Sequence, residues 1–183
     1  MNNQVQTQAS NNKTAKTAAG VQISPYQRLV SLPVQADNIF HFPEGLPAFE
    51  NVKEFVFLLR PDTKPFIFMQ SLNPPDLAFV CIDPFMVYSD YCPNISEGDR
   101  MFLRLERPED AMILSIVTVR PNVRETTTNL QGPIVINIQS CIGKQIVCEG
   151  QQYPLRYRIW DALEKVQARG GEAKPAYKEA GVV

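Results

Sequence analysis

The chain has one histidine and four cysteines in 183 residues, and these shortages limit the chemistry it can carry out. A hydrolytic triad needs a histidine between a carboxylate and a nucleophile, but His41 stands between two phenylalanines in a strand-like run, where a structural or surface role is expected. The cysteines show no C-x-x-C spacing, and Cys81 and Cys148 lie in apolar runs, so buried reduced thiols are expected. Phosphate-binding glycine motifs are absent. We therefore predict no enzyme activity, no metal and no cofactor.

Long apolar runs and an excess of one charge are also absent. Uninterrupted apolar stretches, such as 111–114, are far too short to cross a bilayer. The first twenty residues lack the apolar stretch of a secretory signal. Lys and Arg total 18 against 19 Asp and Glu, so no long-range field favours nucleic acid or an anionic membrane. The sequence predicts a soluble, cytoplasmic protein that contacts neither.

The composition divides the chain into three parts. Residues 1–30 are polar, so we expect a disordered N-terminal extension. Residues 31–162 contain short β-type runs separated by Pro, Gly, Asn and Asp, which predict one β-barrel domain. Residues 163–183 are expected to form a short helix and a loose tail, because apolar residues recur at helical spacing from Ile159 onward.

Short strands recur about every ten residues in the middle part. The predicted strands are 55–59, 66–70, 77–82, 101–106, 112–119, 134–139, 142–149 and 155–160. Residues 112–119 are apolar on both faces, which indicates a central strand covered on two sides. Residues 142–149, with a turn or bulge at Gly143, should return antiparallel to 134–139. The predicted fold is all-β: a small closed or partly open antiparallel β-barrel with a short C-terminal helix.

Two polar clusters have a functional interpretation beside a structural one. Glu106 and Asp110 belong to an acidic group that could supply an acid and a base, but its spacing favours a surface turn. Arg156 and Arg158 alternate with Tyr157, and basic residues interleaved with aromatics can bind single-stranded nucleic acid. An oligonucleotide-binding small barrel is therefore the alternative function, although arginines shielding a sheet edge fit the neutral overall charge better.

Three turn-like segments are apolar or uncharged where loops are usually charged. In the first, Gly45 between two prolines specifies a rigid turn that should present Leu46 and Phe49. Rigid apolar loops with polar borders suit protein binding, but such loops can equally fold back onto their own core. The segments are 42–50, 83–85 with 89–91, and 126–133.

These segments, in their order and spacing, resemble the FliW family over residues 39–158. The strongest pieces are F-P-E-G-L-P-A-F-E at 42–50, M-Q-S at 69–71, residues 79–84, N-L-Q-G-P-I-V-I-N at 129–137, and G-K-Q at 143–145 followed by Tyr153 and Arg156. Ala48 stands where the family commonly has Gly, and Gly132 where it commonly has Ala. A positive φ angle would be unfavourable for Ala48.

The resemblance implies a cytoplasmic all-β adaptor, both flagellin chaperone and regulator of translation. It would bind newly made flagellin and the RNA-binding carbon storage regulator CsrA, which represses flagellin translation. Flagellin would occupy the adaptor until export, after which the free adaptor would bind CsrA and relieve the repression. The sequence leaves open which surface meets which partner, whether CsrA binding is retained, what the N-terminal extension does, and the oligomeric state, for which a monomer is expected.

The matching motif positions give the expected protein-binding residues. Gly45, Pro47 and Pro133 are expected to hold loop shape. The full set is Phe42, Glu44, Gly45, Leu46, Pro47, Phe49, Asn129, Leu130 and Pro133.

Overall fold

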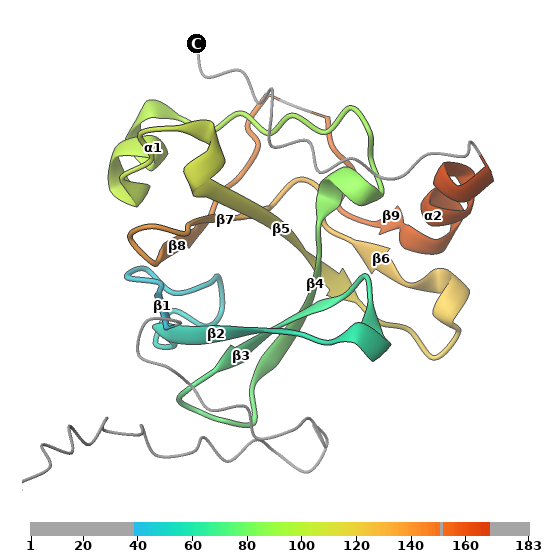
Figure 1. The fold of residues 1–183 in the computed structure, drawn as a ribbon, viewed down its shortest axis with the longest axis horizontal. Helices are drawn as coiled ribbons and strands as arrows, with labels where there is room; N and C mark the ends of the chain where they lie inside the picture. The colour runs from blue at the N-terminus through green and yellow to red at the C-terminus, as the bar shows by residue number, and fades with distance from the viewer. Residues whose placement is uncertain (1–38, 151, 169–183) are drawn as a thin grey trace, which may run out of the picture.

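The computed structural model describes residues 39–150 and 152–168, in which seven strands close into a barrel (Figure 1). The order is β4-β3-β2-β1-β8-β7-β5, and β4 also pairs with β5, which closes the ring. This confirms the predicted all-β barrel. The predicted extension over 1–30 and the tail after residue 168 lie outside the described residues. The barrel strands are β1 (Phe40–His41), β2 (Glu54–Leu59), β3 (Ile67–Ser71), β4 (Ala78–Ile82), β5 (Ala111–Thr118), β7 (Ile134–Asn137) and β8 (Ile142–Gln145).

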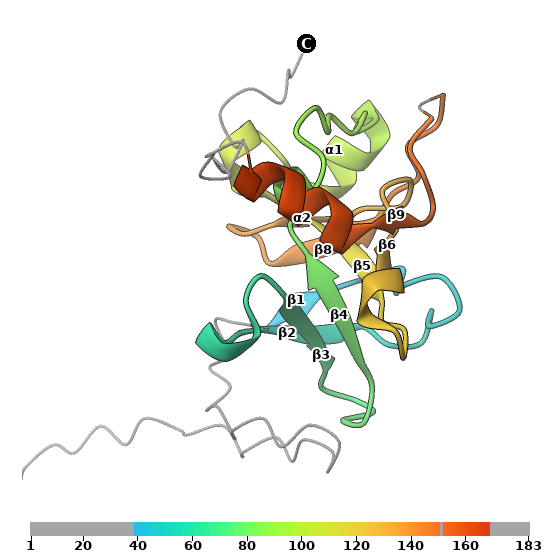
Figure 2. The ribbon, with the colours of Figure 1, turned by 90° about the vertical axis from the view of Figure 1, so that its right-hand side faces the viewer.

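Neighbouring barrel strands are antiparallel except β1 and β8, which are parallel with His41 opposite Ile142. Two short strands, β6 (Thr127–Thr128) and β9 (Tyr157–Arg158), extend the sheet beyond β5. Figure 2 shows helix α2 (Ile159–Ala168) beside them. The remaining elements are helix α1 (Glu97–Leu103) and 3-10 turns η2 (Pro61–Thr63), η3 (Pro84–Met86), η4 (Pro108–Asp110) and η5 (Val123–Glu125).

The apolar side chains form two cores on opposite faces of β5 and β7. One core consists of strand residues and the loop after β1, and fills the barrel. The other includes residues of α1 and α2, and lies between the barrel and these helices. Leu114 and Ile134 belong to the first core, whereas Ile113 and Val135 belong to the second. The prediction that 112–119 is covered on both faces is therefore confirmed for β5.

Helix α1 replaces the strand predicted over 101–106. Its N-cap is Ser96, whose Oγ accepts a hydrogen bond from the Asp99 backbone N–H at 3.1 Å. Leu103 is buried and Met101 is exposed, although an alternating strand would have buried both. The strand prediction was wrong because the alternation M-F-L-R-L-E also fits a short helix that buries one side chain per turn.

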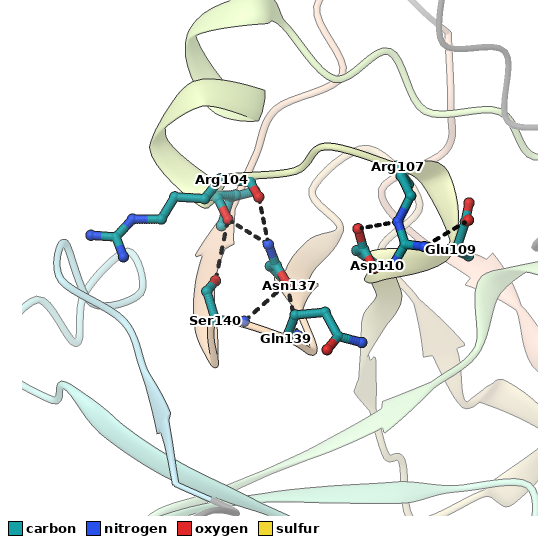
Figure 3. Close-up of polar contacts among 8 residues, drawn as sticks. Arg104, Arg107, Glu109, Asp110, Asn137, Gln139 and Ser140 are labelled. Atoms are coloured by element: carbon teal, nitrogen blue, oxygen red, sulfur yellow. Dashed lines mark hydrogen bonds and ion pairs between the residues drawn. The ribbon is translucent and has the colours of Figure 1, made fainter.

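The side chain of Asn137, at the end of β7, holds the end of α1 (Figure 3). Its Nδ2 donates to the carbonyl oxygens of Leu103 and Arg104 at 3.0 and 2.7 Å. Its Oδ1 accepts from the backbone N–H groups of Gln139 and Ser140 at 2.8 and 3.1 Å. Asn137 thus satisfies carbonyls that a helix end leaves without partners, and it fixes α1 against the β7–β8 turn.

Three other predictions need correction. The last extended segment is only β9, because α2 begins at Ile159 and not after residue 162. Ile138 lies beyond the end of β7 and is exposed. Gly143 is not at a turn but within β8, where a Cβ would lie 2.2 Å from Cζ of Phe42. The missing side chain makes room for that buried ring.

Candidate protein-binding surface

Consecutive residues of β8 connect the predicted motif segments. Gly143 makes room for Phe42, at the start of the loop after β1. Lys144 Nζ lies 3.2 Å from Glu44 Oε2 in the same loop. Gln145 Nε2 donates to the Gly132 carbonyl oxygen at 2.8 Å. Segments 42–50 and 126–133, far apart in the sequence, therefore meet at this strand.

The first segment is a set of tight turns. Gly45 has φ +72°, and a Cβ there would lie 2.7 Å from the Glu50 Cα. The Phe49 N–H donates to the Leu46 carbonyl oxygen at 2.8 Å, closing a turn in which Ala48 has φ +67°. The expected conflict between alanine and a positive φ is therefore present. Backbone hydrogen bonds from Glu50 itself and from Ala48 hold the pKa of the Glu50 carboxyl below its ordinary value.

The turns bury some of the predicted contact residues and expose others. Leu46 is only 2% exposed and packs in the barrel core with Phe42. The expectation that Leu46 is presented at the surface was wrong, because the turn points its side chain inward. Phe49 is 37% exposed, with its ring edge-on to Phe79 at 5.1 Å between centroids. Glu44, together with the neighbouring prolines, is also exposed.

The third segment, 126–133, is fixed by hydrogen bonds and by burial. Asn129 Oδ1 accepts hydrogen bonds from the backbone N–H groups of Gln131 and Gly132, each at 3.0 Å. Leu130 is fully buried, and its N–H donates to the Pro154 carbonyl oxygen at 3.1 Å. Pro133 is buried and Asn129 half-buried. The predicted residues of this segment therefore fix the shape of the loop and offer little side-chain surface.

The second segment contacts the third. Asp83 Oδ1 accepts the Phe85 N–H at 2.9 Å, which starts η3. Tyr91 is buried and donates its hydroxyl to the Leu130 carbonyl oxygen at 2.7 Å. Its ring packs against Phe85, with 5.7 Å between centroids. This segment belongs to the core between the barrel and the helices.

Two residues of the basic face considered for nucleic acid, Tyr157 and Arg158, make internal contacts. The Tyr157 ring is half-buried and packs in a T-shaped arrangement against Tyr88, with 5.4 Å between centroids, which reduces the ring surface available for stacking on bases. Arg158 NH1 lies 3.7 Å from Asp161 Oδ2. These contacts favour the structural interpretation of the arginines.

Two of the residues considered for acid–base chemistry, His41 and Asp110, lie close to charged side chains. His41 Nδ1 lies 3.6 Å from Glu54 Oε1 at an exposed position. Asp110 is held by Arg107, with NH2 to Oδ1 at 2.8 Å, so the acidic group is partly neutralised (Figure 3). Within residues 39–150 and 152–168, no group of three His, Cys, Asp or Glu side chains could hold a metal ion. In the same ranges no helix is long and apolar enough to cross a membrane.

The cysteines fit the prediction of buried thiols only in part. Cys81 and Cys148 are buried, as expected, whereas Cys92 is exposed and Cys141 half-buried. Burial raises the pKa of the Cys81 thiol to about 12. Cys81 is therefore unreactive at neutral pH, because the thiolate is the reactive form.

Comparison with known proteins gives one consistent family. The family described as FliW protein matches residues 25–159. The flagellar assembly factor FliW of Caldicellulosiruptor saccharolyticus is 37% identical over 132 residues, which cover 72% of this chain and 86% of that protein. That of Moorella thermoacetica is 34% identical over 149 residues, covering 79% and 94%. A solved structure, described as a crystal structure of the flagellar assembly factor FliW, superposes with a TM-score of 0.66 at 34% identity, covering 70% of this chain and 89% of that one. This chain belongs to the FliW family.

Proposed function

We propose that this protein is a cytoplasmic flagellar assembly factor that binds flagellin and, when free of it, binds and antagonises CsrA. It acts by binding and not by catalysis. The observation that carries the proposal is the extent of the family match, since the chain spans 86% and 94% of two proteins named flagellar assembly factor FliW. The barrel, whose loop 42–50 is partly exposed, is consistent with this role.

The exposed part of loop 42–50 is the proposed contact surface. Glu44, Pro47 and Phe49 reach the surface there, and an aromatic ring on a rigid backbone is the kind of anchor that carries binding energy in interfaces. The buried members of the predicted set have a different role in this proposal. Phe42, Gly45, Leu46, Asn129, Leu130 and Pro133 hold the loops in place.

Partner switching requires only that flagellin and CsrA bind with negative coupling. If each partner weakens the other by a given factor, the coupling is reciprocal by thermodynamic necessity. Overlapping binding surfaces would prevent the two partners from binding at the same time. Coupling through conformational states would instead weaken the affinity for the second partner by a smaller factor. The response would then follow the free flagellin concentration relative to its dissociation constant.

The test is calorimetric titration with monomeric flagellin, using Phe49→Ala and a matched control. Leu59 is also apolar and is 68% exposed, at the far end of β2 from the loop. Truncating a central aromatic anchor costs about 2 kcal/mol or more in binding, or roughly 30-fold, whereas Leu59→Ala should bind like the parent. Flagellin binding unchanged by Phe49→Ala would move the contact surface elsewhere. No binding by the folded parent would refute the proposed function.

A further inference from the structure

Lys144 joins three elements that are distant in the sequence. From β8, its Nζ lies 3.2 Å from Glu44 Oε2 in loop 42–50 and 2.9 Å from Asp99 Oδ1 on α1. The ammonium also lies 4.9 Å from the centroid of the Phe102 ring, within the range of a cation–π contact. Only 23% of the Lys144 side chain is exposed, so the surrounding protein restricts where the charge can be.

The side of this contact that faces α1 is held by further hydrogen bonds. Asp99 Oδ2 accepts a hydrogen bond from the Ser96 hydroxyl at 2.6 Å, while Ser96 Oγ caps the helix. Burial raises the pKa of Asp99, but the bonds from Ser96 and Lys144 outweigh burial and leave this pKa below its ordinary value. The bond to Asp99 raises the pKa of Lys144, and the weaker bond to Glu44 adds to that effect. The charged pair therefore persists across the neutral range.

The loop side of the contact is more exposed than the α1 side, where the Asp99 side chain is 21% exposed. Glu44 is 55% exposed and stands at the border of the turns that carry Phe49. A second lysine, Lys53, donates to the Pro43 carbonyl oxygen at 2.6 Å. Lys144 joins the first residues of the loop to β8, and Lys53, the residue before β2, joins them to the end of the same β1–β2 connection. The loop is therefore anchored at the point where it leaves the core.

We propose that Lys144 is a positioning residue that anchors loop 42–50 to β8 and α1 in the conformation that binds a partner protein. The inference rests on the proposed function, since it concerns the same surface. Lys144 need not touch the partner, because its ammonium is already held by Glu44 and Asp99. Its contribution is to reduce the conformational freedom that the loop would lose on binding.

The first test needs no partner. Amide hydrogen exchange of Gly45 and Phe49, whose N–H groups close the turns, is compared in the parent, Lys144→Met and Lys165→Met, the control on α2. Exchange should be about threefold to fivefold faster in Lys144→Met, the size expected when an ion pair of this exposure is lost. It should be unchanged in the control. Equal exchange rates in parent and Lys144→Met would overturn the inference.

The second test is affinity for monomeric flagellin. Lys144→Met should bind about threefold to fivefold more weakly, and Lys144→Arg, which keeps the charge, should recover most of this loss. If Lys144→Met fails to fold, Glu44→Gln removes the loop side of the contact alone and should produce the same faster exchange. If the parent and Lys144→Met bind flagellin with equal affinity, this inference is overturned and the proposed function remains intact. A parent that does not bind would overturn both.

Discussion

Replacing Ala48 by glycine should stabilise the protein, because Ala48 holds a conformation that costs an L-residue free energy. Its φ is +67°, at the third position of a turn whose second residue is Pro47 and which the bond from Phe49 N–H to Leu46 O closes. Turns of this type favour glycine there. Relieving the left-handed conformation should stabilise the protein by roughly 1–2 kcal/mol. The extra conformational freedom of glycine in the unfolded chain reduces this gain by about 0.4–1 kcal/mol. The net gain is about 0.5–1 kcal/mol.

Thermal and urea unfolding would measure this gain. For a chain of this length the melting temperature should rise by about 1–4 °C, and the urea midpoint should rise with an unchanged m-value. Two glycine-to-alanine variants at other positions with positive φ serve as controls. Gly150 has φ +73° with open space around it, so Gly150→Ala should cost roughly 1 kcal/mol from backbone conformation alone. Gly45→Ala adds a backbone clash at 2.7 Å and should cost about 2–4 kcal/mol. A loss of stability in Ala48→Gly would refute the reasoning.

Three further predictions follow from other parts of the structure. Asn137→Ala removes four hydrogen bonds at a buried position. Urea unfolding should show that it lowers the free energy of unfolding by about 3 kcal/mol. A loss below about 1 kcal/mol would contradict the role given to Asn137. Gly143→Ala places a Cβ against the Phe42 ring and should lower the free energy of unfolding by about 1–3 kcal/mol. Adding Phe42→Leu should recover part of this loss. Equal losses in the single and double variants would argue against the steric cause. The lowered pKa of Asp99 contributes stability above about pH 4 that disappears as pH falls through the folded-state pKa, so the melting temperatures of parent and Asp99→Asn should differ at pH 7 and converge near pH 2.

The sequence predicted the barrel because its central strands are strongly patterned. β5 is apolar on both faces and is covered on both. β1 has only two residues and pairs in parallel with β8, an arrangement that no local pattern specifies. Helix α1 was missed because Ser96 and Asp99 form a weak capping signal, while the alternation that follows favours a strand.

The candidate site was predictable as a set of loops but not as a surface. Proline and glycine located the turns of 42–50, whereas the burial of Leu46 depends on the direction in which the turn closes. An apolar residue in a loop can point either way, and only tertiary structure decides. Lys144 lies in a recognised motif, but its contacts come from Glu44 and Asp99, 100 and 45 residues earlier in the chain.

The most direct test of the proposed function is competition between the two proposed partners. The purified protein is titrated with monomeric flagellin alone and then after saturation with CsrA, with each partner shown to be folded. We predict tight flagellin binding that CsrA weakens, and CsrA binding that flagellin weakens by the same factor. Flagellin binding that is indifferent to bound CsrA would leave a flagellin chaperone without a regulatory role. Failure to bind either partner would contradict the proposed function.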